Sequence, residues 1–189
     1  QVGNDIDGEG TNDYSGRSVS IDSDGSHVAI GAYANDGSGL DSGHVRIYSW
    51  DGSAWNQAGS DINGEAQSDY SGFSVSIDSD GSHVAIGAYG NDGSGSNAGH
   101  VRIYEYSSGS WSQVGSDIDG EADSDSSGYS VSIDSDGSHV AIGAIYNDGG
   151  GSDSGHVRIY SWDGSAWAQV GNDIDGEADS DSSGYSVSI

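Results

Sequence analysis

The sequence predicts an all-β protein made of repeated units, and three observations support this prediction. The tract Ser-His-Val-Ala-Ile-Gly-Ala begins at residues 26, 82 and 138, so it recurs at a constant interval. Of the 30 Leu, Ile, Val and Phe residues, 28 are β-branched Ile or Val, which favour strands. Apolar residues alternate with a period of two, whereas Gly and Ser interrupt every window long enough for a helix.

The repeat is 56 residues long. The tract Gly-His-Val-Arg-Ile-Tyr, at 43–48, 99–104 and 155–160, has the same spacing, and residues 21–56 differ from residues 133–168 at only five positions. The chain is therefore a single repeat array of three units and a partial fourth, which are 1–56, 57–112, 113–168 and 169–189.

The first half of a unit predicts two strands. Residues 18–21 alternate between polar and apolar and lead into the turn Asp24-Gly25, which is a strong hairpin signal. Residues 27–32 are apolar or small on both faces, so this strand should lie centrally in a sheet that is covered on both sides.

The second half of a unit predicts a loop and two further strands. Residues 35–39 have the composition of a loop. In the run 44–50, Val45 and Ile47 share one face, and Asp51-Gly52 then turns the chain back. The run from Trp55 to about Ile62 is more polar and should form an outer edge, which completes a four-stranded meander.

Tandem four-stranded meanders cannot bury their faces alone, and radial stacking as the blades of a β-propeller is the common solution. The chain then holds three full blades and two orphan strands, at Gln1–Glu9 and Ser183–Ile189. A propeller needs about four to eight blades to close. We therefore expect the orphan edges to pair with a second copy of the chain or with further blades of a longer chain.

Composition excludes several classes of protein. The formal net charge is −27 and no Lys is present, which argues against nucleic-acid binding and against a basic membrane-surface patch. No apolar run is long enough to insert into a membrane. The absence of Cys excludes disulfides, cysteine-based zinc sites and thiol nucleophiles. Because the chain opens on Gln1 without a signal-peptide pattern, we expect a fragment or a processed piece.

The motifs resemble the FG-GAP repeats of integrin-α-like β-propellers. In the second unit, Ser71-Gly72-Phe73-Ser74-Val75, Asp80-Gly81, Val84-Ala85-Ile86-Gly87-Ala88-Tyr89 and Gly99-His100-Val101-Arg102-Ile103-Tyr104 follow the order of the family pattern. Two features depart from it: Tyr or Ile replaces the Pro after Gly-Ala, and the Asp-Gly hairpin is shorter than the family's calcium hairpin. The resemblance implies the propeller fold and an adhesion or recognition role outside the cell or at its surface.

Acidic residues concentrate on one side of the predicted blade, where the segment before the first strand and the loop after the second strand meet. Carboxylates crowded in Gly-containing loops are compatible with Ca²⁺. We therefore predict calcium at the junctions between blades, and the candidate ligands are Asp5, Asp7, Glu9, Asp13, Asp61, Glu65, Asp69, Asp117, Asp119, Glu121 and Asp125. The alternative is a solvated acidic surface that binds no ion and keeps a secreted or salt-adapted protein soluble.

The loop after the second strand varies most between units, and a variable loop on a rigid scaffold is a common place for recognition. The candidate recognition residues are Asn35, Asp36, Asp41, Asn91, Asp92, Asn97, Asn147, Asp148 and Asp153. Ordinary drift in an exposed turn is the alternative. Either a protein or a glycan could be the ligand.

Catalysis is not expected, because catalytic sites are rarely repeated with identical residues in every unit. His27 and His44 start adjacent antiparallel strands, so they should lie at opposite ends of a blade and share neither a catalytic triad nor a metal. Arg46 and its equivalents should pair with an acid on a neighbouring strand or blade. Trp50 and Trp55 flank a hairpin and should pack across it.

These observations predict a non-enzymatic, extracellular or cell-surface β-propeller module that presents an acidic face, with calcium as a candidate cofactor. The alternative is a purely structural repeat array of a long surface protein or filament, or a propeller assembled or designed from several chains with no specific ligand.

Overall fold

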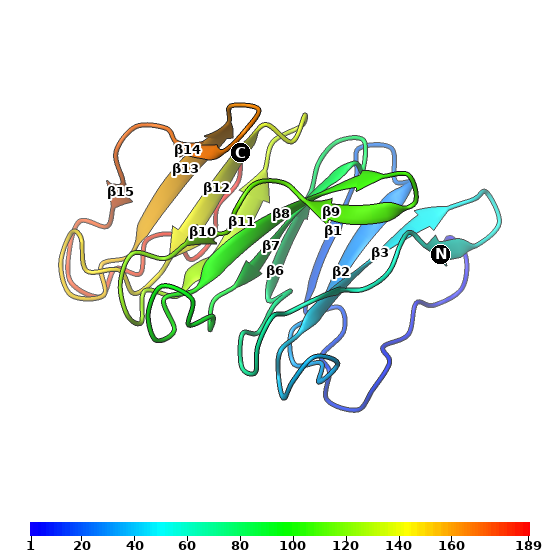
Figure 1. Ribbon diagram of the computed structural model, residues 1–189, viewed down its shortest axis with the longest axis horizontal. Helices are drawn as coiled ribbons and strands as arrows, with labels where there is room; N and C mark the ends of the chain where they lie inside the picture. Colours follow the sequence, from blue (N-terminus) through cyan, green and yellow to red (C-terminus); the bar gives the residue numbers. More distant parts are fainter.

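The computed structural model describes residues 1–189 and consists of strands and turns without any helix. Three antiparallel sheets lie side by side along the long axis of the molecule (Figure 1). No helix is present that is long and apolar enough to cross a membrane. The all-β prediction is confirmed.

Each sheet is a meander whose strands follow one another in space in their order along the chain. The first sheet contains β1 Ser18–Ile21, β2 His27–Ala32, β3 His44–Trp50, β4 Trp55–Gln57 and β5 Ile62–Asn63. The second contains β6 Ser74–Ile77, β7 His83–Ala88, β8 His100–Ser107, β9 Ser110–Gln113 and β10 Ile118–Asp119. The third contains β11 Ser127–Ile133, β12 His139–Ala144, β13 His156–Trp162, β14 Trp167–Gln169 and β15 Ile174–Asp175.

The fourth strand of each blade differs from the prediction, because it is split into two short strands. In the first sheet, β4 and β5 both pair with β3, and residues 58–61 between them leave the ladder. Gly59 lies there with φ of +79°, in the left-handed region that favours glycine and breaks the pleat. The sheet is still four-stranded in outline, with an interruption in its outer edge.

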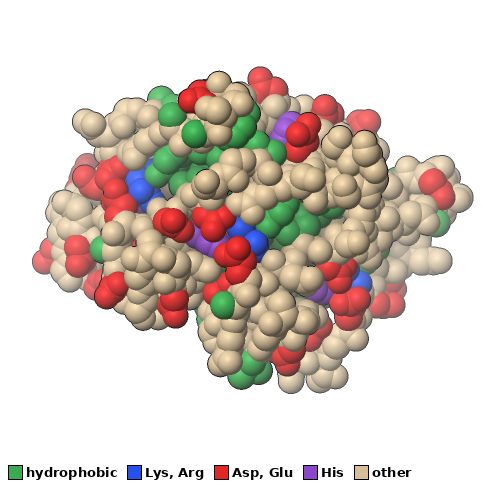
Figure 2. Space-filling view, viewed as in Figure 1, with side chains coloured by type: hydrophobic (Ala, Val, Ile, Leu, Met, Phe, Trp, Pro, Cys, Tyr) green, Lys and Arg blue, Asp and Glu red, His purple; other side chains and the backbone are tan.

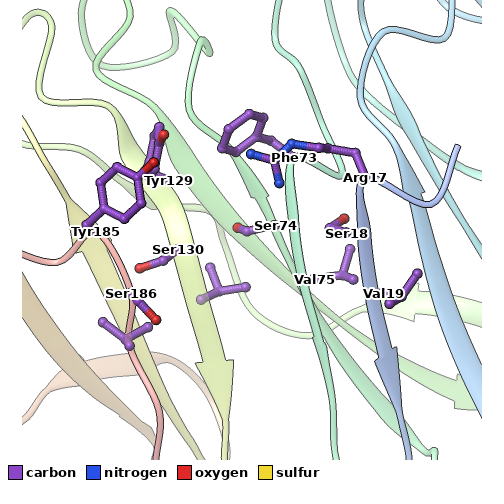
Figure 3. A pocket seen from close by; sticks show the side chains of 12 residues that line it. Arg17, Ser18, Val19, Phe73, Ser74, Val75, Tyr129, Ser130, Tyr185 and Ser186 are labelled. Carbon is purple, nitrogen blue, oxygen red and sulfur yellow. The ribbon is translucent and has the colours of Figure 1, made fainter. Parts of the chain in front are cut away.

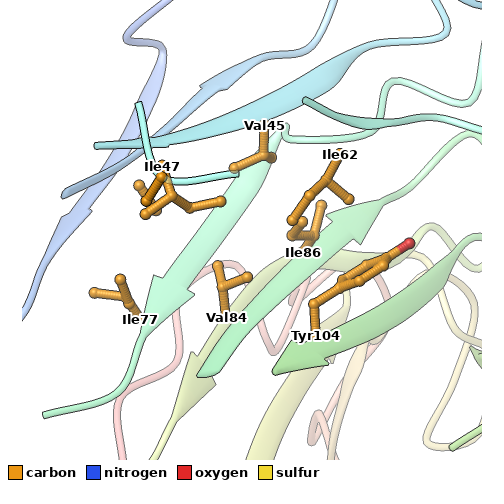
Figure 4. Close-up of a cluster of buried hydrophobic side chains, with 9 residues drawn as sticks. Val45, Ile47, Ile62, Ile77, Val84, Ile86 and Tyr104 are labelled. Carbon is orange, nitrogen blue, oxygen red and sulfur yellow. The ribbon is translucent and has the colours of Figure 1, made fainter. Parts of the chain in front are cut away.

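The hydrophobic core lies between successive sheets (Figure 4). Val45, Ile47 and Ile62 of the first sheet contact the second sheet, where Ile86 and Tyr104 are buried in the same cluster. An equivalent cluster joins the second and third sheets. Because each blade buries one face against the next, the arrangement is that of β-propeller blades, and the predicted fold is confirmed.

The two predicted orphan strands are wrong as strands. Residues 1–9 and 183–189 form no regular strand, because no neighbouring strand is present to complete a backbone ladder with them. They nevertheless lie where the repeat requires: the Trp55 indole Nε1 donates to the Val2 carbonyl at 3.1 Å, and the Ser130 hydroxyl donates to the Gly184 carbonyl at 2.7 Å. The terminal segments thus contact the end blades in the same way as the equivalent segments contact each other at the inner junctions.

Both end faces of the array expose side chains that are buried at the inner junctions. Ile21 is 58% exposed, whereas the equivalent Ile77 is 7% exposed. At the other end, Ile174 is 55% exposed, whereas the equivalent Ile118 is 5% exposed. The first unit also differs in sequence near its exposed face, since Arg17 stands where Phe73 stands in the second unit.

Candidate metal centre

A buried histidine begins the third strand of every blade. His44, His100 and His156 have side chains that are 2%, 1% and 1% exposed. The glycine before each one, such as Gly43 with φ of +75°, has a left-handed backbone that turns the preceding loop into the strand. The histidine is therefore set at the same end of each blade, facing the segment that precedes the blade.

Two carboxylates from different segments approach each of these histidines. In the first blade, His44 Nδ1 lies 3.9 Å from Glu9 Oε2 and 4.0 Å from Asp61 Oδ2. The same arrangement recurs at His100, where the distances are 4.0 Å and 3.8 Å, and at His156, where both are 3.9 Å. The resulting three groups, called the junction triads here, are Glu9–His44–Asp61, Glu65–His100–Asp117 and Glu121–His156–Asp173.

The junction triads were missed at the sequence level, although Glu9, Asp61, Glu65, Asp117 and Glu121 were all candidates. The prediction grouped carboxylates of one junction, whereas each triad takes its Glu from one junction and its Asp from the next. The histidine was excluded because two histidines of one blade lie at opposite ends. That exclusion holds for the pair, since His27 opposes Ser49 and His44 opposes Ala32, but it did not consider one histidine with two acids. The signal in the sequence is the recurrence of all three residues at the 56-residue period.

An arginine orients the glutamate of each junction triad. Arg46 Nη1 lies 3.4 Å from Glu9 Oε1, which leaves the other carboxylate oxygen facing His44. Arg46 Nη2 also donates to the Asp7 carbonyl at 2.9 Å, and Arg102 and Arg158 repeat both contacts. The predicted pairing of these arginines with acids of a neighbouring segment is confirmed, and it holds the glutamate in place.

Burial determines the charge of the triad histidines. Desolvation lowers the pKa of His44, His100 and His156, and lowers that of His100 to about 4. The imidazoles are therefore neutral at neutral pH, and each has a nitrogen lone pair. Neither ring nitrogen of His100 has a hydrogen-bond partner, and Nδ1 of His156 has none.

The remaining predicted calcium ligands do not gather into one group. Asp13, Asp69 and Asp125 are buried and stabilise loops: the amide of Asn35 donates to Asp13 at 2.7 Å, and the backbone N–H of Ala66 donates to Asp69 at 2.8 Å. Asp5 accepts a hydrogen bond from Gln1. Asp7 and Asp119 accept arginine through their backbone carbonyls, and their side chains are exposed. Calcium binding by the full set stays a prediction.

The predicted recognition residues build their own loops. In the first loop the Asn35 side chain accepts from Gly37 N and the Asp36 side chain accepts from Asp41 N, both at 2.8 Å. The other two loops repeat these bonds, with Asn91, Asp92 and Asn97, and with Asn147, Asp148 and Asp153. Asn35, Asn91 and Asn147 are also buried. These side chains therefore shape the loop, and their role in recognition stays a prediction.

A second histidine lies beside Asp and Ser at the opposite end of each blade. His27 Nδ1 is 2.8 Å from Asp22 Oδ2 and 2.9 Å from the Ser26 hydroxyl. Both partners contact the same ring nitrogen, whereas a hydrolase triad places its serine and its acid on different nitrogens. In the third blade this end also brings together Asp134, Asp136 and His139, which could hold a metal ion.

The first strands of the blades line a groove of about 490 Å³ (Figure 3). Four equivalent positions, Arg17, Phe73, Tyr129 and Tyr185, line it together with the Ser and Val residues that follow them. The Arg17 guanidinium lies over the Phe73 ring at 4.8 Å. This groove is where the axis of a propeller would pass.

Comparison with known proteins supports the fold. Residues 6–48 and 63–104 match the family described as FG-GAP repeat, which confirms the resemblance seen in the sequence. No curated protein sequence matches the chain.

Solved structures resemble the chain at low sequence identity. Candidate 6-phosphogluconolactonases from Bacteroides fragilis and Bacteroides uniformis have TM-scores of 0.54 and 0.52 and identities of 12% and 11%. The chain is covered over 85% and 83% of its length, and each neighbour over 40% of its own. Hydrazine synthase of Kuenenia stuttgartiensis has a TM-score of 0.51 at 10% identity, covering 93% of this chain and 42% of that one. The chain thus spans about two fifths of the length of these neighbours.

The prediction that the chain is not an enzyme is contradicted by this comparison. Proteins named as candidate 6-phosphogluconolactonases share the fold, so this fold by itself does not exclude catalysis. Identities of 11% and 12% show the fold alone, and no lactonase activity is assigned to this chain.

Proposed function

This chain carries FG-GAP repeats on β-propeller blades, and we propose that it serves as a recognition module whose acidic loop face binds a cationic protein surface. In keeping with the resemblance to integrin-α-like repeats, the proposal locates the module outside the cell or at its surface, in an adhesion or recognition role.

One observation carries this proposal: three of the four arginines are buried and paired with acids of this chain, and the fourth, Arg17, lies over an aromatic ring. The chain has four Lys and Arg against 31 Asp and Glu. Arg46, Arg102 and Arg158 are 4–7% exposed and are bound to glutamates and backbone carbonyls, and Arg17 lies over Phe73. Arg17 is the one exposed arginine, so the carboxylates of the loop face far outnumber the exposed arginines, and the complementary partner is cationic.

The acidic face is formed by the loop after the second strand of each blade and by the segment that leads into the next blade, and these two contact each other. The Ser38 hydroxyl of the loop after β2 donates to the Gly64 carbonyl at 2.6 Å, and in the next loop the Ser96 backbone N–H donates to Asp123 Oδ1 at 3.1 Å. Acidic side chains are spread over the visible surface, and arginine and histidine lie together among some of them (Figure 2). Because these loops are fixed on rigid sheets, the carboxylates keep a constant spacing.

The test compares two variants that lose the same charge from opposite faces. Asp7, Asp119 and Asp175 occupy equivalent exposed positions on the loop face, and Asp24, Asp80 and Asp136 occupy equivalent exposed positions in the hairpins of the other face. Binding of a decalysine peptide is measured by calorimetry at low salt. Asp7→Asn, Asp119→Asn and Asp175→Asn together should weaken binding at least about threefold more than the matched triple variant. Equal weakening would mean that only net charge matters, which would contradict a specific face.

A second candidate function, a structural assembly of blades, is favoured by the exposed end faces. The face of the first blade around Ile21 and the face of the third blade around Ile174 are the two halves of a contact that the chain already makes twice internally. We propose that a second copy of the chain covers them, head to tail.

A further inference from the structure

We propose that the three junction triads bind Zn²⁺, one ion per triad, and that each ion fastens a blade to the segment that precedes it. This proposal is independent of the partner proposed for the acidic face. It rests on the donor atoms of each triad, on the burial of the histidines and on the solvent hollow beside the first triad.

The donor atoms converge on one point in each triad. All three ligand atoms lie within 4.8 Å of one another, and the histidine nitrogen is 3.8–4.0 Å from each carboxylate oxygen. With bonds of about 2.0–2.2 Å, tetrahedral donors lie about 3.4 Å apart. Each histidine–carboxylate distance has to close by about half an ångström, and the glutamates, at 44–48% exposure, have the freedom to move.

The histidine of the triad is a buried donor atom without a partner. His100 is 1% exposed, and its Nδ1, which faces Glu65 and Asp117, makes no hydrogen bond. His156 Nδ1 lies in the same position relative to Glu121 and Asp173 and also makes none. A buried polar atom without a partner is destabilising, and a metal ion at the centre of the triad would satisfy it.

The chemistry of the donors selects zinc over calcium. Calcium takes six to eight oxygen ligands, whereas one neutral imidazole with two carboxylates suits zinc, which accepts nitrogen and oxygen in a four-coordinate site. Water completes the fourth position in this arrangement. Arg46 bound to the outer oxygen of Glu9 is the kind of neighbouring contact that orients a carboxylate ligand.

An ion has access to the first triad from solvent. Glu9 and Asp61 line an open hollow of about 550 Å³ whose other lining residues are Gln57, Gly59, Ser60 and Asn63, and none of them is hydrophobic. The hollow lies where residues 1–9 meet the first blade. Zinc can therefore enter an assembled blade without local unfolding.

The triads are placed to join blades. Glu65 follows β5 at the outer edge of the first sheet, while His100 and Asp117 belong to the second sheet. Glu121 follows β10 of the second sheet, while His156 and Asp173 belong to the third. Each ion therefore adds a polar link at a junction whose interior is held by the hydrophobic clusters.

The test counts the zinc ions that each variant retains. The full chain is stripped with a chelator, loaded with Zn²⁺, dialysed and analysed for metal by mass spectrometry. Glu65→Gln with Asp117→Asn removes both carboxylates of one triad, and both side chains are partly exposed, so folding should be retained. This variant should hold one ion fewer per chain than the unmodified protein. Any ion at Asp134–Asp136–His139 is common to both proteins and cancels in the difference.

Asp24→Asn with Asp80→Asn is the matched control, because it removes the same charge from exposed hairpins at the opposite face. The control should hold as many ions as the unmodified protein. When the proteins are loaded with Co²⁺ instead, the visible absorption bands of the bound ion should lose about a third of their intensity in the triad variant and none in the control. Failure to retain zinc, an equal loss in the control, or displacement of zinc by millimolar Ca²⁺ would each overturn the proposal.

Discussion

At the scale of single residues, each blade contains a histidine–aspartate pair that closes its first hairpin. In the second blade, His83 Nδ1 lies 2.8 Å from Asp78 Oδ2, and the His83 backbone N–H donates to Asp78 Oδ1 at 3.0 Å. Asp78 is 3% exposed, so the pair is largely shielded from water. The ring contact recurs at His27 and His139, at 2.8 Å in both, which makes the pair a fixed part of the blade.

The pair predicts a pH-dependent contribution to stability. Burial raises the pKa of Asp78, but the hydrogen bonds from His83 and Ser82 outweigh it and leave the pKa below the usual 3.8. The hydrogen bond to Asp78 raises the pKa of His83 above 6.5. The aspartate's contribution is present above pH 3.8 and is lost as pH falls through its folded pKa. The histidine's contribution is present below pH 6.5 and is lost as pH rises through its folded pKa.

Asp78→Asn should therefore lower the free energy of unfolding by about 1.5–3 kcal/mol between pH 4 and 6.5, and by less outside that window. Urea unfolding at a series of pH values measures it. Asp80→Asn, at an exposed position in the same turn, is the control and should change stability little at any pH. A deficit in Asp78→Asn that is constant from pH 3 to 8 would contradict the assignment.

At the scale of elements, the first strand of each blade packs on the second strand of the blade before it. The Ser18 hydroxyl donates to the Gly72 carbonyl at 2.7 Å, and Ser74 and Ser130 make the equivalent bonds to Gly128 and Gly184. At Gly87 an added Cβ would lie 2.0 Å from the Gly128 carbonyl oxygen. The spacing of the blades near the axis therefore depends on a position without a side chain.

Gly87→Ala should destabilise the protein by about 2–3 kcal/mol, because the backbone of the neighbouring blade has to move. Gly109 is a suitable control, since nothing lies within 4 Å of its added Cβ and its φ is +87°. Asn tolerates that conformation, so Gly109→Asn should cost at most about 1 kcal/mol. Thermal unfolding followed by circular dichroism compares the two, and a Gly87→Ala midpoint equal to that of the control would contradict the close approach.

At the scale of the whole molecule, the two end faces are complementary and exposed. Two copies would supply six blades, which is within the range of about four to eight in which propellers close. Residues 1–21 and 169–189 differ at only five positions, so the terminal segments of two copies would compete for one place at each junction. Head-to-tail association then requires one of the two segments to move aside.

The expected result in solution is a dimer with twice the 19.2 kDa mass of one chain, measured by light scattering. Ile21→Asp places a charge in the end face at a position that is 58% exposed in the single chain, so the variant should fold and remain monomeric. Leu40→Asp, at a loop position that is 57% exposed, is the control and should still dimerise. A monomeric unmodified chain at high concentration would contradict the assembly.

Much of the element-level structure was predictable because it depends on neighbours in the sequence. The strands at 18–21, 27–32 and 44–50 agree with the structure, since alternation and the Asp-Gly turns specify them locally. Trp50 and Trp55 pack across their hairpin as predicted, with ring centroids 5.4 Å apart. The split of the fourth strand was missed because a single left-handed Gly59 interrupts an otherwise strand-like run.

The sequence by itself determined the repeat, most of the strands and the large excess of acidic over basic residues, because these follow from local pattern and composition. Only the tertiary structure decided which residues meet across the junctions. Glu9, His44 and Asp61 are far apart in the chain and come together through the pairing of β3 with β5 and the docking of residues 1–9 on the first blade. The terminal segments also depend on tertiary structure. Residues 1–9 and 183–189 have a strand-like pattern but form no strand, because a backbone ladder needs a neighbouring strand.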